Sequence, residues 1–356
     1  MRHVGLGILV SVAAMVSAST ALAADLDYPA DMRGSYNSWD EPTDPLMEFE
    51  AGLRYHYSRG GSSISTSGLN NSGIIVPATN GSTNDTTQFG EVFLRLNDLA
   101  TDTYLNVYGG YSVHLDANYD NGLTSGQTTL GNMAYAVADF GYMPVKLGND
   151  DVGATFGGFV GYQYLNDAPT IGGAEYRPIK DNSSLSWTTG TSSFFVPVEH
   201  ADHTLNINAL RLGLSTKTVA GSFDVTAEVA AIPYASLSGI LGGHSFAPIT
   251  SGGYTTYKET ESKFEGSGWG GAADVMVGYN VTDNVAVRVG GRATYLRGQG
   301  NLVYGLADVT APVDSNSDGT YDIGPSTGGT YYLTPERIDA FSLWRYGVLA
   351  ELKVQF

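Results

Sequence analysis

The chain has 356 residues, of which 46 are glycine and 23 are tyrosine, and its formal net charge is −18. So acidic a chain does not suit nucleic-acid binding, and the lack of cysteine excludes disulfides and thiolate metal sites. Abundant glycine and aromatic residues, with only 15% charged residues, favour tightly turned strands over helices, so we expect an all-β fold.

The N-terminal residues have the three parts of a secretory signal peptide. Arg2 supplies the positive charge, residues 4–16 are apolar, and Ala21-Leu22-Ala23 fits a small-residue cleavage site. The apolar run is shorter than the roughly 20 residues that span a bilayer as a helix. We therefore expect residues 1–23 to be removed on export, residues 24–45 to form a periplasmic leader, and residues 46–356 to fold as one domain.

After residue 45, apolar residues alternate with polar ones. Residues 46–58 place Phe49 and Leu53 on one face and Glu50 and Arg54 on the other. This period of two is typical of a strand with one apolar and one polar face. Segments of about 10 such residues, separated by turns, are typical of transmembrane barrels.

Ten segments show this period. They are residues 46–58, 88–96, 104–115, 133–143, 152–164, 205–215, 223–231, 269–279, 285–295 and 343–356. The sixth fits only with a bulge near Ala209, because Asn206 and Asn208 alternate out of phase with Arg211.

Connections after the even-numbered segments are short, as in 148–151, and the others are long, as in 298–341. Short periplasmic turns and long extracellular loops are typical of outer-membrane barrels. The sequence therefore predicts a transmembrane antiparallel up-and-down β-barrel of ten strands. Twelve strands is the alternative, if residues 166–203 add two. We favour a hairpin above the membrane there, formed by Ser184–Trp187 and Ser193–Val196.

The polar faces of these segments carry eight acids and seven bases. They are Glu48, Glu50, Arg54, Glu91, Arg95, Asp139, Arg211, Asp224, Glu228, Asp274, Arg288, Arg292, Arg345, Glu351 and Lys353. A soluble β-sandwich would have to bury this face, and unpaired buried charge costs several kcal/mol. A barrel interior offers water or mutual pairing instead.

The strand number bears on function. Side chains just fill an eight-stranded barrel, whereas sixteen to eighteen strands leave a channel. Ten strands with nearly balanced inward charge predict a lumen plugged by an ion-pair network. We expect a structural or surface-interaction role without catalysis. A small pore for ions or small solutes is the alternative.

Two features could bind metal. Asp314, Asn316, Asp318 and Asp322 have the spacing of oxygen ligands in an EF-hand calcium loop, but Pro325 replaces the bidentate glutamate. Either calcium binds weakly there or the segment is an ordinary Asx-rich turn, and we expect no other cofactor. His56 and His114 are expected to face the lumen as hydrogen-bonded interior side chains.

The C-terminus resembles the assembly signal of outer-membrane barrels, because Leu352, Val354 and Phe356 continue the apolar alternation to the last residue. The resemblance implies recognition by the barrel-assembly machinery and contact with outer-membrane lipid and lipopolysaccharide. Residues 24–39 resemble the leaders of opacity-like surface barrels from alphaproteobacteria. The sequence names no surface ligand.

Ten strands and five long loops also resemble the omptin surface proteases, which use two aspartates facing an aspartate–histidine pair. Asp116 and Asp120 follow the third segment at the wrong spacing, and His244 follows the seventh without a neighbouring aspartate. The pair Asp202-His203 is expected to cap a strand. A general base needs its orienting acid within reach, so a degenerate omptin-like protease is only the third hypothesis.

Overall fold

The computed structural model describes residues 47–71, 74–120, 125–149, 152–171, 176–178, 195–197, 203–242, 244, 246–251, 254–258, 260–310, 327–332 and 335–356. The expected signal peptide, leader and calcium loop lie outside these residues. No helix in the described part of the chain is long and apolar enough to cross a membrane.

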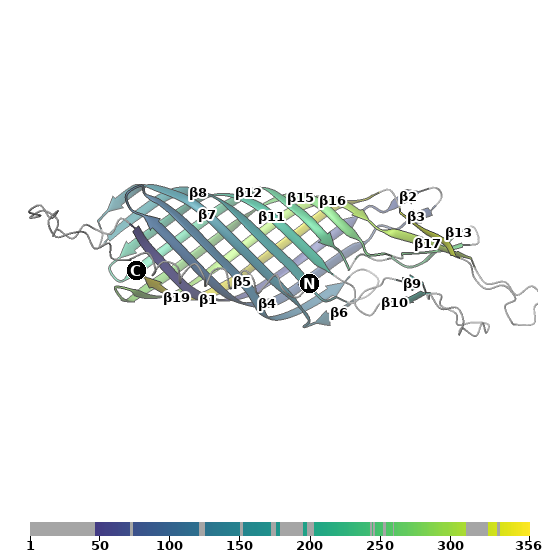
Figure 1. Ribbon diagram of the computed structural model, residues 1–356, viewed down its shortest axis with the longest axis horizontal. Coiled ribbons are helices and arrows are strands. Elements are labelled where there is room, and N and C mark those ends of the chain that lie inside the picture. The colour runs from purple at the N-terminus through teal and green to yellow at the C-terminus, as the bar shows by residue number, and fades with distance from the viewer. Residues whose placement is uncertain are drawn as a thin grey trace, which may run out of the picture. The chain divides into compact units, whose positions relative to one another are not determined.

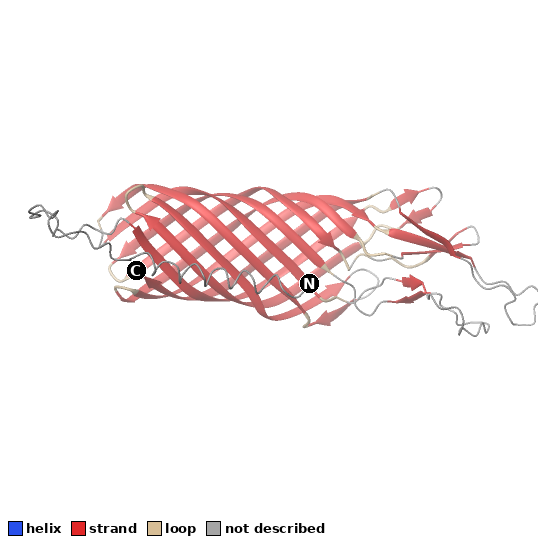
Figure 2. Cartoon of the chain, viewed as in Figure 1, coloured by secondary structure: helices blue, strands red, loops and turns tan. Residues whose placement is uncertain are grey.

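Ten long strands form a closed antiparallel barrel (Figures 1 and 2). They are β1 (Met47–Thr66), β4 (Asn80–Asp98), β5 (Thr103–Asp120), β7 (Gly131–Gly148), β8 (Val152–Pro169), β11 (Thr204–Ala220), β12 (Phe223–Ile240), β15 (Lys263–Thr282), β16 (Val285–Val303) and β19 (Glu336–Gln355). Neighbours in sequence pair, and β1 pairs with β19 to close the ring. The predicted ten-stranded up-and-down barrel is confirmed.

Nine short strands accompany the barrel in the described residues. β6 (Ser125–Thr128) pairs with the end of β5. The others form separate sheets, namely β2 (Leu69–Asn71) with β3 (Ile74–Val76), β9 (Tyr176–Pro178) with β10 (Phe195–Pro197), and β13 (Ile249–Ser251), β14 (Tyr254–Lys258), β17 (Gly305–Thr310) and β18 (Thr327–Tyr332) together. Because β9 and β10 pair only with each other, the twelve-strand alternative is wrong. The expected hairpin strand at Ser184–Trp187 lies outside the described residues.

Exposed hydrophobic side chains form a belt to which every barrel strand contributes. Examples, one per strand, are Leu53, Leu94, Val107, Phe140, Val160, Leu214, Val229, Val275, Val289 and Val348. Soluble monomers rarely expose a continuous apolar patch larger than a few hundred Å². The belt is therefore the surface that faces lipid, and tyrosine and tryptophan side chains such as Tyr57 and Trp269 lie among its exposed residues.

The strands are longer than the predicted segments because their polarity reverses along their length. On β16 the outward side chains are apolar as far as Tyr295, and beyond it Arg297 and Gln299 point outward. The inward side chains change in the opposite sense, from Arg288 to the buried Leu296. Near the long loops the barrel is therefore polar outside and apolar inside, as a water-soluble barrel is. A search for alternating residues with an apolar outward face therefore ends each predicted segment where the strand leaves the lipid.

The inverted half holds an apolar core that the sequence analysis did not anticipate. Its buried members include Phe89, Leu115, Leu205, Ile207, Ala209, Ile232, Leu237, Phe264, Leu296, Leu302, Phe341 and Leu343. The core fills the barrel at the end where the long loops emerge.

One register prediction is wrong for this reason. β11 needs no bulge near Ala209, because Ile207, Ala209 and Arg211 are all buried on the same inward phase. The pairing of β11 with β12 does shift register between Leu210 and Leu212, but the extra residue lies on β12, between Ile232 and Ala235, where Pro233 lacks the N–H needed for the ladder.

His114 does not face the lumen. In the pairing of β4 with β5, Gln88 lies opposite His114 but Phe89 lies opposite Ser112, which is a bulge at Val113. The extra residue turns His114 to the exposed outer face and Leu115 into the interior. His56 lies inside, as expected, and is 2% exposed.

Candidate functional site: the charged lumen

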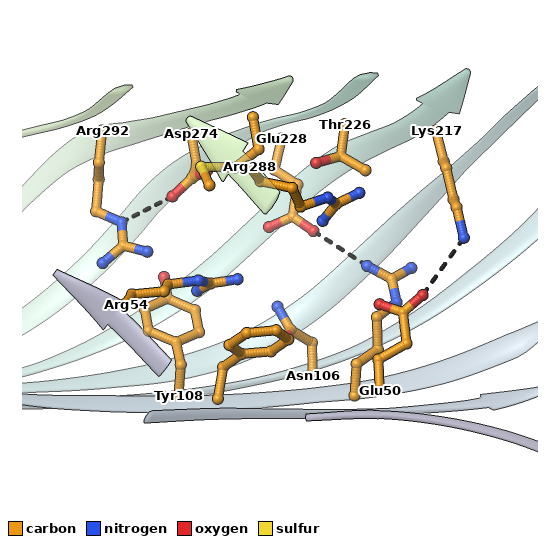
Figure 3. Close-up of a pocket in the computed structure, with 13 residues that line it drawn as sticks. Glu50, Arg54, Asn106, Tyr108, Lys217, Thr226, Glu228, Asp274, Arg288 and Arg292 are labelled. Atoms are coloured by element: carbon orange, nitrogen blue, oxygen red, sulfur yellow. Dashed lines mark hydrogen bonds and ion pairs between the residues drawn. The ribbon is translucent and has the colours of Figure 1, made fainter. Parts of the chain in front are cut away.

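The fifteen charged side chains singled out from the sequence come together in the barrel interior, in the half away from the long loops. Their strands place them there because each alternates with a lipid-facing residue, as Arg54 does with Leu53 and Tyr55. Figure 3 shows part of the resulting network.

The centre of the network joins strands that are not neighbours in the sheet. Arg54 on β1 lies 3.0 Å from Glu91 on β4. Arg292 on β16 reaches Glu91 at 2.8 Å and also Asp274 on β15 at 2.8 Å. Since β1 and β19 separate β4 from β16 in the sheet, the contact between Arg292 and Glu91 crosses the lumen.

A second group is built on cross-strand neighbours. Glu351 on β19 lies opposite both Arg54 and Arg288 in register. It forms an ion pair with each, at 3.6 Å from Arg288, and Arg288 also pairs with Asp224. Opposite charges placed directly across neighbouring strands stabilise a sheet.

At the short-turn end, Glu50 lies between two lysines. Lys353 is 3.1 Å away and Lys217 is 3.5 Å away. The neighbouring Glu48 accepts a 2.8 Å hydrogen bond from Asn97. Three further pairs complete the set: Arg95 with Glu228 at 3.9 Å, Arg211 with Asp139 at 3.2 Å, and Arg345 with Asp85 at 2.8 Å.

Two members of these pairs, Asp85 and Lys217, were missed by the sequence analysis. Each lies on the inward phase of its strand, just beyond the predicted segment. Asp85 precedes Phe89 by four residues and Lys217 follows Ser215 by two. Extending the alternation past the apolar residues would have found both.

Aromatic rings cover the guanidinium groups from the side. Arg54 lies 4.1 Å from the ring centre of Phe93, Arg95 lies 4.0 Å from Tyr104, and Arg292 lies 4.5 Å from Tyr108. Arginine stacks on aromatic faces because its planar guanidinium is weakly hydrated. The rings therefore fill the lumen between the ion pairs and hold the guanidiniums in place.

Little space remains inside. The cavity bordered by Glu50, Arg54, Tyr108 and Arg292 has a volume of about 30 Å³, which holds a water molecule or two and nothing larger. Beyond it the interior is filled by the apolar core. The charged network and the apolar core therefore occupy much of the interior that the described residues form.

A separate polar cluster lies near the long loops. His244 Nδ1 is 2.8 Å from the hydroxyl of Ser262, and His244 Nε2 is 3.3 Å from Glu336. Tyr304 donates a 2.6 Å hydrogen bond to Glu336. The sequence offered His244 no nearby acid, but the fold brings Glu336 to it from 92 positions along the chain.

This cluster contains the residue types of a serine nucleophile, a base and an orienting acid, but it is closed to substrate. Ser262 is 0% exposed, His244 6% and Glu336 1%. Burial also lowers the pKa of His244, and burial lowers the pKa of the nearby loop residue His203 to about 4. Both imidazoles are therefore neutral at pH 7, packed inside the protein.

No group of three or more metal-ligating side chains occurs among the described residues. Asp314, Asn316, Asp318 and Asp322 lie outside them, so the calcium hypothesis stays a prediction. Asp116 and Asp120 are both exposed on β5. The described part of Asp202-His203 is His203, which is buried next to the start of β11.

No family model and no curated protein matches the chain. Among solved structures it is similar to the outer membrane protease OmpT from Escherichia coli, with 12% identity, a TM-score of 0.50, and coverage of 87% of this chain and 97% of that one. Outer membrane protein OprG from Pseudomonas aeruginosa matches with 8% identity, a TM-score of 0.32, and coverage of 87% and 95%. The similarity to OmpT concerns the fold alone.

Proposed function

We propose that this chain, a β-barrel of the bacterial outer membrane, is an occluded scaffold that holds its long loops at the cell surface and neither conducts solutes nor catalyses a reaction. The observation that carries the proposal is the filled lumen: paired charges in one half and an apolar core in the other.

The free energy needed to separate buried ion pairs supports the occluded state. The interior arginines and acids are mostly buried, with exposed side-chain fractions of 10% for Arg54 and 0% for Glu91. Breaking one buried pair leaves a charge without compensation, at a cost of about 3–5 kcal/mol. A pore would require many of these pairs, with their stacked rings, to separate together.

The absence of catalysis is part of the proposal. A nucleophile must reach its substrate, and the one serine–histidine–acid arrangement among the described residues is buried. The bulge at Val113 turns His114 outward, so that His114, Asp116 and Asp120 share the exposed outer phase of β5. We assign no catalytic role to this open strand face.

The barrel half nearer the long loops has a polar outer face, and this supports a role at the cell surface. Outward residues such as Gln299 and Asn301 on β16 extend the rigid sheet beyond the lipid, so the loops are held above the membrane on a stiff support. Loops on a rigid scaffold are where recognition residues most often lie.

Liposome swelling tests the proposal. Vesicles containing the refolded protein should swell in isotonic arabinose no faster than empty vesicles, while vesicles with an open porin swell. Swelling above the empty control would favour the small pore instead. Cleavage of a basic peptide by the purified protein, lost on His244→Ala, would favour the hydrolase.

A further inference from the structure

The small cavity in the charged half of the lumen is bordered by more bases than acids. The bases are Arg54, Arg95, Lys217, Arg288 and Arg292, and the acids are Glu50, Glu228 and Asp274. Figure 3 shows Arg54, Arg288 and Lys217 extending toward this space from different strands. The side chains that border the cavity therefore carry a net positive charge, although the whole chain has a net charge of −18.

Arg95 has poor hydrogen-bond acceptors in this network. Its Nε donates to Asn97 at 2.9 Å. Its Nη1 is 3.9 Å from Glu228, beyond hydrogen-bond distance, and its Nη2 is 3.7 Å from the sulfur of Met143, a weak acceptor. The two terminal nitrogens of this guanidinium therefore have no oxygen acceptor among the described residues.

Three other bases around the cavity also have donors left over. Two nitrogens of the Arg54 guanidinium donate to acids, and no described residue accepts a hydrogen bond from the third, Nη2. Arg288 Nη1 lies 3.6 Å from Glu351, which is too long for a hydrogen bond. Lys217 has three N–H donors and makes one long contact, 3.5 Å from Glu50. A species that accepts hydrogen bonds and donates none would satisfy these groups.

The volume of the cavity limits what can enter it. About 30 Å³ leaves room for one or two water molecules. A chloride ion is close to a water molecule in size, whereas sulfate and phosphate are larger. Chloride only accepts hydrogen bonds, and its charge is opposite to the excess around the cavity. Lys217 lies at the short-turn end with its side chain 28% exposed, so an anion can enter from the periplasmic side.

We propose that the cavity between Arg54, Arg95, Arg288 and Lys217 binds one small monatomic anion, which is chloride under physiological conditions. The anion accepts hydrogen bonds from donors that the acids leave unpaired, and through them it links β1, β4, β16 and β11. It stabilises the barrel because it binds the folded chain and has no site in the unfolded one. The site belongs to the occluded lumen of the proposed function and adds a ligand to that lumen.

Thermal melting of the refolded protein in detergent micelles tests the site. Sodium chloride, titrated against sodium gluconate at constant ionic strength, should raise the melting temperature by about 2–4 °C, and the shift should saturate. Gluconate is the reference salt because it screens charges to the same extent but is too large for the cavity.

Variants separate the site from general salt effects. Arg95→Gln should lose most of the chloride-dependent shift, while Arg95→Lys, which keeps the charge, should retain part of it. Lys146→Gln is the matched control, because Lys146 is a base that pairs with Asp102 outside the cavity. Its chloride-dependent shift should equal that of the unchanged protein.

Crystals of the unchanged protein soaked in sodium bromide give a test that needs no variant. Anomalous scattering should show one bromide ion within hydrogen-bond distance of Arg54 and Arg95. Equal melting temperatures in chloride and gluconate, an undiminished chloride shift in Arg95→Gln, or a cavity without bromide would overturn the proposal. Neither melting nor bromide binding reports conduction, so each of these results would leave the occluded lumen to the conductance measurement.

Discussion

Glu91 on β4 and Arg292 on β16 meet across the lumen at 2.8 Å, although two strands separate them in the sheet. The contact directly joins two strands that are not neighbours in the barrel wall. Glu91 also pairs with Arg54 and accepts a hydrogen bond from Tyr135, so three interior groups converge on this one carboxylate.

Glu91→Ala should therefore destabilise the barrel by about 3 kcal/mol, because Arg54 and Arg292 each lose a buried partner. Equilibrium unfolding in urea, with the protein in lipid vesicles, measures the change. Glu265→Ala removes an exposed glutamate from the outer face of β15 and should change stability by less than about 0.5 kcal/mol. Equal effects of the two variants would show that the lumen pairs contribute nothing measurable.

The apolar core in the barrel half nearer the long loops leads to a second prediction. Ile207 is 0% exposed inside β11, so Ile207→Ala should cost about 2–5 kcal/mol in the same unfolding experiment. Its neighbour Asn208 points outward, and Asn208→Ala serves as control with a small effect. A core that tolerates Ile207→Ala as well as the surface tolerates Asn208→Ala would be hydrated, not packed.

The buried histidines predict acid sensitivity at the loop end. The pKa of His203 is lowered to about 4 and that of His244 is lowered as well, both by burial. The unfolded chain therefore binds more protons than the folded one between the ordinary histidine pKa of about 6.5 and about 4, so stability falls as pH falls through this window.

Hydrogen exchange of residues 241–262, compared at pH 7.5 and pH 5 after correction for intrinsic rates, measures this loss. Neither ring nitrogen of His203 has a hydrogen-bond partner among the described residues. His203→Leu should therefore reduce the acid sensitivity, while His114→Asn, on the exposed face, should leave it unchanged. Identical pH profiles for His203→Leu and the unchanged protein would exclude His203 as a cause.

Much of this fold was readable from the sequence because a membrane barrel must alternate. The residues around Leu53 and Arg54 show one face for lipid and one for the interior, and counting back by twos from Phe356 places Glu351 and Lys353 inside, where the structure has them. Periodicity determines which face a side chain occupies.

Sequence periodicity could not predict other features of the fold, for physical reasons. Alternation does not say which strands face each other across the lumen, so the partnership of Glu91 with Arg292 needed the closed ring. Single-residue irregularities such as the bulge at Val113 reverse every assignment beyond them. The strand ends with polar outward residues were predicted to be loops. Asp85, which lies on such an end of β4, was therefore not predicted to lie in the lumen.

Phe356 supplies a prediction about assembly. Its N–H donates a 2.8 Å hydrogen bond to the Phe49 carbonyl oxygen at the seam between β19 and β1, and the residue is 74% exposed. Phe356→Ala should slow insertion into vesicles that contain purified barrel-assembly machinery, if the C-terminal strand is the recognition signal. Phe140 on β7 is also exposed, at 54%, and Phe140→Ala should leave the insertion rate unchanged. The same rate for both variants would remove the signal role from the last residue.

Single-channel recording in planar bilayers tests the occluded lumen most directly. The refolded protein should give no steady conductance steps at neutral pH, because ion pairs and the apolar core fill the barrel. An open porin added afterwards to the same bilayer is the positive control, because its conductance steps show that the recording detects channels. Steady, reproducible steps from the unchanged barrel would contradict the account and make it a small pore.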